Sequence, residues 1–196
     1  MPAYSPWVIL LGAAFTENIL LVNYLGMCSF LGVSRQMKAA VGLGLAVTLV
    51  LAVTCPLNHM VYYRILVPLG MEYLQFVAFM LIIAATVQLL EMIIERFSPR
   101  LYYALGIFLP LITVNCAILG VCLFMVIRDY PLLHSAAYGA GSGLGWMLAI
   151  IAMAGLRERL QAARLPKGLD GPGITLIITG IMALAFTGLA GMLNIR

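Results

Sequence analysis

Two cysteines stand in the same short motif in the two halves of the chain. Residues 28–33 read CSFLGV and residues 116–121 read CAILGV, so Cys28 and Cys116 both begin the pattern C-x-x-L-G-V. A single cysteine in an apolar run is usually only a small hydrophobic residue. Cysteine sulfur is also the ligand of iron–sulfur clusters. Because the two cysteines occupy equivalent positions, we favour the second interpretation and take them as candidate metal ligands.

Two thiolates are too few for a complete cluster, which normally needs four. The other cysteines, Cys55 and Cys122, have no counterpart in the opposite half, and Cys122 lies six residues past Cys116, off its helical face. We therefore do not expect them to complete the set. A partner chain of the same design would supply the second pair, which is a hypothesis at this stage.

The elements that must position these cysteines are membrane helices. The chain is 64% hydrophobic and 9% charged, whereas soluble domains are about half apolar and about a quarter charged. The basic residues that give the net charge of +4 are confined to the loops, so they indicate topology and not nucleic-acid binding. The N-terminal residues show no basic segment and no cleavage site, so we expect no removable signal peptide. The sequence predicts an all-α integral membrane protein.

Six apolar runs predict six transmembrane helices, because a bilayer core requires about 20 apolar residues per helix. The runs cover about residues 7–33, 39–57, 73–94, 101–127, 132–156 and 173–193. The first and fourth are too long for one straight crossing, contain glycine, asparagine or proline, and carry the repeated cysteines. We expect both to be interrupted near the midplane. We interpret residues 1–196 as a single membrane domain.

The two halves read as inverted copies of one another. AAVGLG at residues 39–44 follows the first cysteine motif, and AAYGAG at residues 136–141 follows the second in the same order. The predicted repeats cover about residues 6–95 and about residues 100–194. Three crossings per copy invert the second copy, and inverted repeats place their special sites near the midplane.

The basic residues predict the orientation of the chain. Lys and Arg gather in the odd-numbered connections: Arg35, Lys38, Arg96, Arg100, Arg157, Arg159, Arg164 and Lys167. The other side holds Arg64, Arg128 and Arg196. By the positive-inside rule, the odd-numbered connections are cytoplasmic. Both termini then lie on the outer, periplasmic side of a bacterial inner membrane.

Two carboxylates fall within the predicted spans, where a charge is costly and usually faces a cavity or a partner. Glu91 lies about a turn from Arg96, so it is either an interfacial or arginine-paired carboxylate or part of a cation pathway. Glu17 is the weaker candidate for the same pathway. We interpret His59 and His134 as interfacial residues and not as metal ligands.

Four glycines at residues 139, 141, 143 and 145 resemble a nucleotide-binding loop only superficially. Their spacing differs from G-x-G-x-x-G and no strand precedes them. Close packing of helices is the better explanation.

With these residues in view, nearly the whole chain resembles the Nqr/Rnf family of membrane subunits. This family includes the E subunit of the sodium-translocating NADH:quinone reductase and the A subunit of the Rnf complex. The most specific stretches are LGMC at residues 25–28, GVS at 32–34, LGIFLPLITVNC at 105–116 and GLGWMLAI at 143–150.

The resemblance implies a redox-driven pump. In that family, the E subunit pairs with a homologous D-type subunit in the opposite orientation, and each contributes two cysteines to one [2Fe-2S] cluster in the membrane. Those cysteines correspond to Cys28 and Cys116 here. The cluster relays electrons from the NADH-oxidising subunit to a flavin, and further subunits carry the quinone site. The family also places an acidic residue implicated in sodium uptake at the position of Glu91, which favours the cation pathway.

The two complexes within the family differ in small details. Glu17-Asn18 and GWM at residues 145–147 resemble the quinone-reductase protein, whereas the compact connection at residues 65–73 resembles the Rnf protein, which works with ferredoxin and NAD. We favour the quinone reductase, with Rnf as the alternative. The remaining hypotheses are an inverted-repeat secondary transporter without a redox role and a purely structural assembly protein.

Overall fold

The computed structural model describes residues 5–97, 109–161 and 171–193 of the chain, and all regular structure in these ranges is helical. In chain order the elements are α1 (Pro6–Leu11), the π-helical η1 (Gly12–Thr16), α2 (Met27–Val33), α3 (Met37–Val61), the π-helical η2 (Tyr62–Leu66), α4 (Val67–Leu69), the short 3₁₀ helix η3 (Glu72–Leu74), α5 (Gln75–Phe97), α7 (Leu109–Thr113), α8 (Cys116–Ile127), α9 (Leu132–Gln161) and α10 (Pro172–Leu193). Some positions of the sequence analysis lie outside the described residues: the start of the fourth run, Arg100, Arg164, Lys167 and both termini.

Three helical segments in the described ranges are long and apolar enough to cross a membrane. They are Met37–Leu69, Glu72–Ile93 and Leu132–Leu160, and shorter apolar helices cover Pro6–Thr16, Leu111–Ile127 and Pro172–Gly188. The second run is much longer than residues 39–57, because the helix continues through η2 and α4. At 1.5 Å per residue its 33 residues extend about 50 Å, which exceeds the thickness of a bilayer core of about 30 Å.

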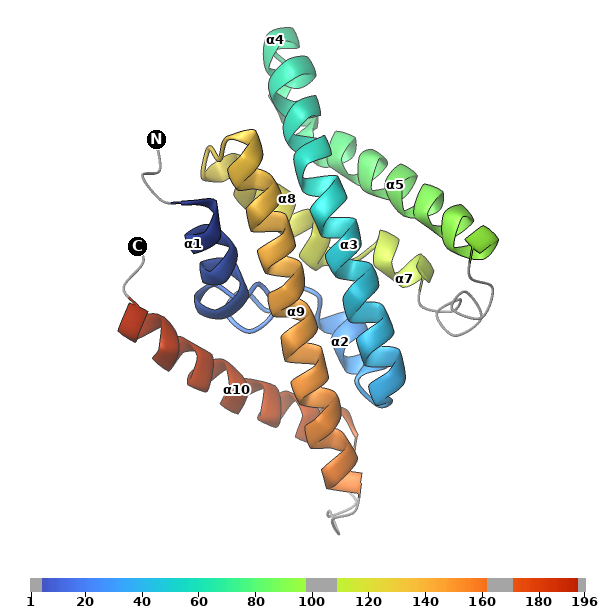
Figure 1. Cartoon of the computed structure of the whole chain (residues 1–196), viewed down its shortest axis with the longest axis vertical. Helices are drawn as coiled ribbons and strands as arrows, with labels where there is room; N and C mark the ends of the chain where they lie inside the picture. Colours follow the sequence, from blue (N-terminus) through green and yellow to red (C-terminus); the bar gives the residue numbers. More distant parts are fainter. Residues whose placement is uncertain (1–4, 98–108, 162–170, 194–196) are drawn as a thin grey trace.

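Helices α3 and α9 form the centre of the fold and run antiparallel, side by side (Figure 1). Glycines on α9 allow this close approach. A Cβ at Gly139 would lie 2.7 Å from Cys55 Cβ, and a Cβ at Gly143 would lie 2.7 Å from Thr48 Cα. Since these contacts involve main-chain or Cβ atoms of α3, no side-chain movement could make room for a larger residue.

Gly141 and Gly145, the other two glycines of this part of α9, face α1 and η1 on the opposite side of the helix. A Cβ at Gly145 would lie 2.6 Å from the carbonyl oxygen of Ala14, and Gly141 packs as closely against the main chain of Leu10. Thus α9 carries two interleaved small-xxx-small patterns, one toward α3 and one toward α1 and η1. The prediction of close helix packing at these glycines is confirmed.

Both cysteine-bearing runs are interrupted, as the sequence predicts. In the first run, residues 17–26 separate η1 from α2, and in the fourth run, residues 114 and 115 separate α7 from α8.

Helices α5 and α10 cross obliquely on opposite sides of the α3–α9 pair (Figure 1). Their outer faces are apolar and open, with Leu81 71% and Leu184 75% exposed, as expected for surfaces that contact lipid or other subunits.

We expect Gly143→Ala to destabilise the protein, because the new methyl group forces α3 and α9 apart. Overpacking of this kind costs about 1–3 kcal/mol. The measurement is the thermal unfolding midpoint of the purified protein in detergent. Gly180→Ala in α10 is the matched control, since nothing lies within 4 Å of a Cβ at that position. An unfolding midpoint for Gly143→Ala equal to that of the control would contradict the close contact.

Candidate functional site

The first break is organised by one buried asparagine. The side-chain oxygen of Asn18 accepts hydrogen bonds from the main-chain N–H groups of Leu20 (3.1 Å) and Leu21 (3.4 Å). Its Nδ2 donates to the carbonyl oxygens of Ala14 (3.3 Å) and Gly145 (2.7 Å). Asn18 therefore replaces main-chain hydrogen bonds that the helix loses at the break, and it ties the break to α9.

The second break is capped by another buried asparagine. Asn115 precedes α8, and its Oδ1 accepts a hydrogen bond from the N–H of Ala117 at 3.0 Å, as a helix N-cap does. Its Nδ2 lies 3.3 Å from Ser29 Oγ, to which it donates. Ser29 in turn donates to the carbonyl oxygen of Gly26 at 3.1 Å. Asn115 therefore links the second break to α2 of the first half.

The two breaks meet at Gly26. This residue has φ +84°, a left-handed conformation that glycine adopts without strain. A Cβ here would lie 2.6 Å from Trp146 Nε1, 3.0 Å from Ala117 Cβ and 3.1 Å from Asn115 Oδ1. The main-chain N–H of Gly26 donates to Cys116 Sγ at 2.9 Å. Both the conformation and the packing thus require glycine at the point where the two halves touch.

Cys28 and Cys116 lie at this junction. Cys116 is the first residue of α8, and Cys28 is the second residue of α2, two residues from Gly26. Two residues of chain span at most about 7 Å, so Cys28 stays close to the contact that holds Cys116. Both thiols are free and exposed. Cys116 stands at the N-terminus of α8, where the helix dipole favours a negatively charged group.

Within the described ranges, no group of three or more His, Cys, Asp and Glu residues is arranged so that it could hold a metal ion. The two exposed thiols thus provide two ligands at most. Because both are exposed, a further pair of ligands from another chain can reach them.

Cys55 and Cys122 are buried and have partners of their own. Asn58 Nδ2 donates to Cys122 Sγ at 3.0 Å, and Cys55 Sγ lies 3.5 Å from Ser135 Oγ. These thiols lie in the packed region where α3, α8 and α9 meet. Their burial distinguishes them from the exposed pair.

Glu17 forms an ion pair with Arg128, the residue that follows α8. The side chains are 39% and 33% exposed, respectively. The Arg128 guanidinium also lies 3.3 Å from the Tyr130 hydroxyl and 5.4 Å from the centre of the Tyr138 ring. Burial alone lowers the pKa of Arg128, but the hydrogen bond to Glu17 and the nearby tyrosines outweigh it and raise the pKa above its usual value. Glu17 thus has a charged partner that the sequence did not reveal.

Glu91 is half-buried on α5. The structure gives it neither a hydrogen bond nor an ion pair to any described residue, so the arginine pairing considered from the sequence is not formed there. No described contact links Glu91 to the junction of the two breaks.

Arg157 is a residue that sequence reasoning used only as a topology signal. Its Nη1 donates to the carbonyl oxygen of Leu31 at 3.0 Å and to Ser34 Oγ at 2.7 Å, at the C-terminal end of α2. A cation at a helix C-terminus interacts favourably with the helix dipole. Arg157 thereby fixes the half-helix that carries Cys28 to the end of α9.

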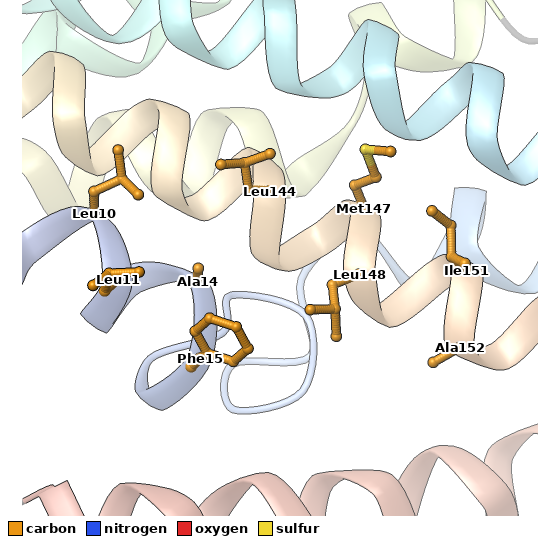
Figure 2. Close-up of a pocket in the computed structure, with 9 residues that line it drawn as sticks. All are labelled: Leu10, Leu11, Ala14, Phe15, Leu144, Met147, Leu148, Ile151 and Ala152. Atoms are coloured by element: carbon orange, nitrogen blue, oxygen red, sulfur yellow. The ribbon is translucent and has the colours of Figure 1, made fainter. Parts of the chain in front are cut away.

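Two pockets lie apart from the cysteines. One, of about 540 Å³, is lined entirely by apolar side chains of α1, η1 and α9, from Leu10 to Ala152, and suits a hydrocarbon chain (Figure 2). The other, of about 870 Å³, brings together His59 and His134 with Arg128 and Asp129. From the sequence we interpreted the two histidines as separate interfacial residues. The fold brings them into one pocket.

Comparison with known proteins identifies the family. Residues 7–193 match the family described as Rnf-Nqr subunit, membrane protein. The chain is 55% identical over 186 residues to the E subunit of the Na(+)-translocating NADH-quinone reductase of Serratia proteamaculans (strain 568), covering 92% of this chain and 94% of that protein. It is 50% identical over 184 residues to the A subunit of the Na(+)-translocating ferredoxin:NAD(+) oxidoreductase complex of Acetobacterium woodii, covering 94% and 96%. The chain therefore belongs to the Rnf-Nqr family of membrane proteins.

Proposed function

We propose that this chain is the E-type membrane subunit of a sodium-translocating NADH:quinone oxidoreductase. In this proposal it holds half of a [2Fe-2S] cluster, together with a homologous D-type subunit in the opposite orientation. The observation that carries the proposal is the pair of exposed, free thiols at the contact between two helix breaks. The names of the relatives support membership of such a complex, in which this chain is not catalytic alone.

The donor set fits a shared cluster. Four thiolates hold a [2Fe-2S] cluster, and this chain offers two on an open surface. Both buried cysteines are engaged with neighbouring polar side chains, so they do not compete for the same role. When bound, the cluster takes up and releases one electron at a time. Residues Cys28 and Cys116 would ligate it from this side.

The remaining residues at the junction would keep these ligands in place. Asn18 and Asn115 satisfy the main chain at the two breaks, so the half-helices need no rearrangement when a ligand binds. Gly26 brings its N–H within 2.9 Å of Cys116 Sγ, and Arg157 holds the end of α2. Preorganisation of this kind is expected of an electron-transfer site, because second-shell hydrogen bonds tune a metal centre.

We further propose six membrane spans arranged as two inverted repeats, with both termini periplasmic. In support, each half contains in order a broken helix with a cysteine, a long central helix and an oblique outer helix (Figure 1). The distribution of Lys and Arg supports the orientation. The alternative is the A subunit of a ferredoxin:NAD oxidoreductase pump, supported by the relative from Acetobacterium woodii.

For the cation we propose Glu91 as a residue of the pathway. It is a half-buried carboxylate on an apolar helix, and no described residue neutralises it. A carboxylate in such a place usually serves an ion path. Glu17 is the weaker candidate, because Arg128 already neutralises it.

Cys28→Ser and Cys116→Ser should each abolish the EPR signal of the iron–sulfur cluster that this chain and its D-type partner hold in the purified complex. Quinone reduction should be lost with it. Cys55→Ser and Cys122→Ser are matched controls that should retain the signal. The readouts are iron content, EPR and turnover. The proposal fails if the first two variants keep both the signal and turnover.

Glu91→Gln should lower sodium-dependent turnover by about tenfold, which corresponds to about 1.4 kcal/mol, while electron entry from NADH stays near the wild-type rate. Glu95→Gln, an exposed carboxylate one turn along α5, is the control. The two activities are measured as sodium-stimulated quinone reduction and as NADH oxidation by an artificial acceptor. Equal loss of both would remove the special role of Glu91.

The orientation predicts which engineered cysteines are accessible from outside. A membrane-impermeant thiol reagent should label Arg64→Cys in intact spheroplasts, and should label Arg35→Cys only after permeabilisation. Both parent residues are exposed in the structure. Labelling of the unmodified protein provides the baseline. The opposite pattern would invert the proposed topology.

A further inference from the structure

Helices α1 and η1 cover only part of one face of α9. Two glycines of α9 pack there against the main chain of Leu10 and Ala14. The covering segment ends at Thr16, where the first break begins. At 1.5 Å per residue, Pro6–Thr16 is about 16 Å long, which is about half of a bilayer core of about 30 Å. In the membrane, the rest of this face of α9 needs another neighbour.

The uncovered part of α9 begins in the apolar pocket of about 540 Å³ (Figure 2). Leu148 and Ala152 line this pocket, and both are exposed. Phe15 of η1 borders the pocket from the other side and is also exposed. Because all of the lining side chains are apolar, a polar ligand would lose its hydration there without gaining a side-chain hydrogen bond. The pocket therefore selects a hydrocarbon chain.

A positive charge follows the pocket on the same side of α9. Each residue of an α-helix turns the chain by about 100°, so Leu148, Ala152 and Arg159 share one side of the helix. Arg159 is exposed near the end of α9. Arg157 lies on the opposite side of the helix, where it binds the end of α2. Arg159 is thus the arginine that continues the face of the pocket.

The spacing between the pocket and this charge matches one leaflet of a bilayer. Leu148 lies near the middle of α9, and Arg159 follows it by 11 residues. This spacing corresponds to about 16 Å, and half of a bilayer core is about 15 Å. A phospholipid whose acyl chain ends in the pocket therefore has its phosphate at the depth of Arg159. A guanidinium binds phosphate through charge-assisted hydrogen bonds.

We propose that α9 binds one phospholipid between the apolar pocket and Arg159, with an acyl chain in the pocket and the phosphate on the guanidinium. The lipid belongs to the leaflet at the C-terminal end of α9, which is the cytoplasmic leaflet in the proposed orientation. Its acyl chain takes the place of the missing half of the first helix. It thereby supports η1 against α9, next to the hydrogen bond from Asn18 to Gly145.

The same observations disfavour two other occupants. A helix is about 10 Å wide with its side chains, so over 16 Å it would occupy about twice the volume of the pocket. The isoprenoid tail of a quinone would fit the pocket, but its neutral headgroup would gain little from the charge of Arg159. A phospholipid uses both the apolar pocket and the charge.

The test is photolabelling of the purified complex in a non-ionic detergent, with a sub-saturating amount of phospholipid that carries a diazirine at the end of one acyl chain. Mass spectrometry should find the label in the α9 peptide that contains residues 144–152. Arg159→Gln should lower this labelling about fivefold, as expected for one basic side chain near a lipid phosphate. Ala152→Phe, which fills the pocket, should lower it at least as much.

The controls are matched in chemistry and lie on another helix. Arg96→Gln and Ala85→Phe change exposed residues of α5 and should label as the wild type does. Unlabelled phospholipid should compete with the probe about fivefold better than diacylglycerol, which has the same chains without the phosphate. If Ala152→Phe does not assemble, Arg159→Gln and this competition decide the result.

Three outcomes would overturn the proposal. Unchanged labelling in Arg159→Gln, or in an assembled Ala152→Phe complex, would show that lipid contacts this face without a specific site. Stronger competition by a long-chain quinone than by phospholipid would identify a quinone tail as the occupant. Absence of label from the α9 peptide of the wild-type complex would indicate that another subunit covers the pocket. None of these outcomes bears on the cysteines, because the lipid site lies apart from them.

Discussion

The fold depends on how the protein satisfies main-chain polar groups where two helices break inside an apolar bundle. In such surroundings there is little water to replace a lost helical hydrogen bond. Asn18 supplies two acceptor contacts and two donor contacts at the first break, and Asn115 caps α8 at the second. These side chains thus lower the free-energy cost of the two breaks, after which α2 and α8 begin with Cys28 and Cys116 in their first turns.

Close packing by glycine makes these hydrogen bonds possible. Asn18 can reach the carbonyl oxygen of Gly145 only because α9 approaches η1 to main-chain contact at that glycine. Trp146 is the next residue, so the same contact delivers its indole to Gly26. The packing of α9 against η1 therefore depends on Gly145, Asn18 and Trp146 together. A change in any of them alters the environment of Cys116.

The sequence predicted the broken helices and their cysteines because the repeated motif and the breaker residues are local features. It placed Cys28 and Cys116 correctly near the breaks, although their use as cluster ligands stays a prediction. It did not predict the partner of Glu17, since Arg128 is 111 residues away and only the fold brings them together. It also ended the second helix too early, because polar residues follow Leu57, whereas the helix includes Pro56 and continues well beyond it.

The two halves share an order of elements but differ in how their breaks are held. The first break has ten residues, with Tyr24 and Gly26 in left-handed conformations, whereas the second has two and a single capping asparagine. The second half also holds the longer break and the α2 helix that follows it: the Gly145 carbonyl accepts from Asn18, Asn115 donates to Ser29, and Arg157 donates to the end of α2. The position of Cys28 thus depends on residues of the second half. A movement of α9 relative to the first half would displace Cys28, so the geometry of the thiol pair is coupled to the packing between the halves.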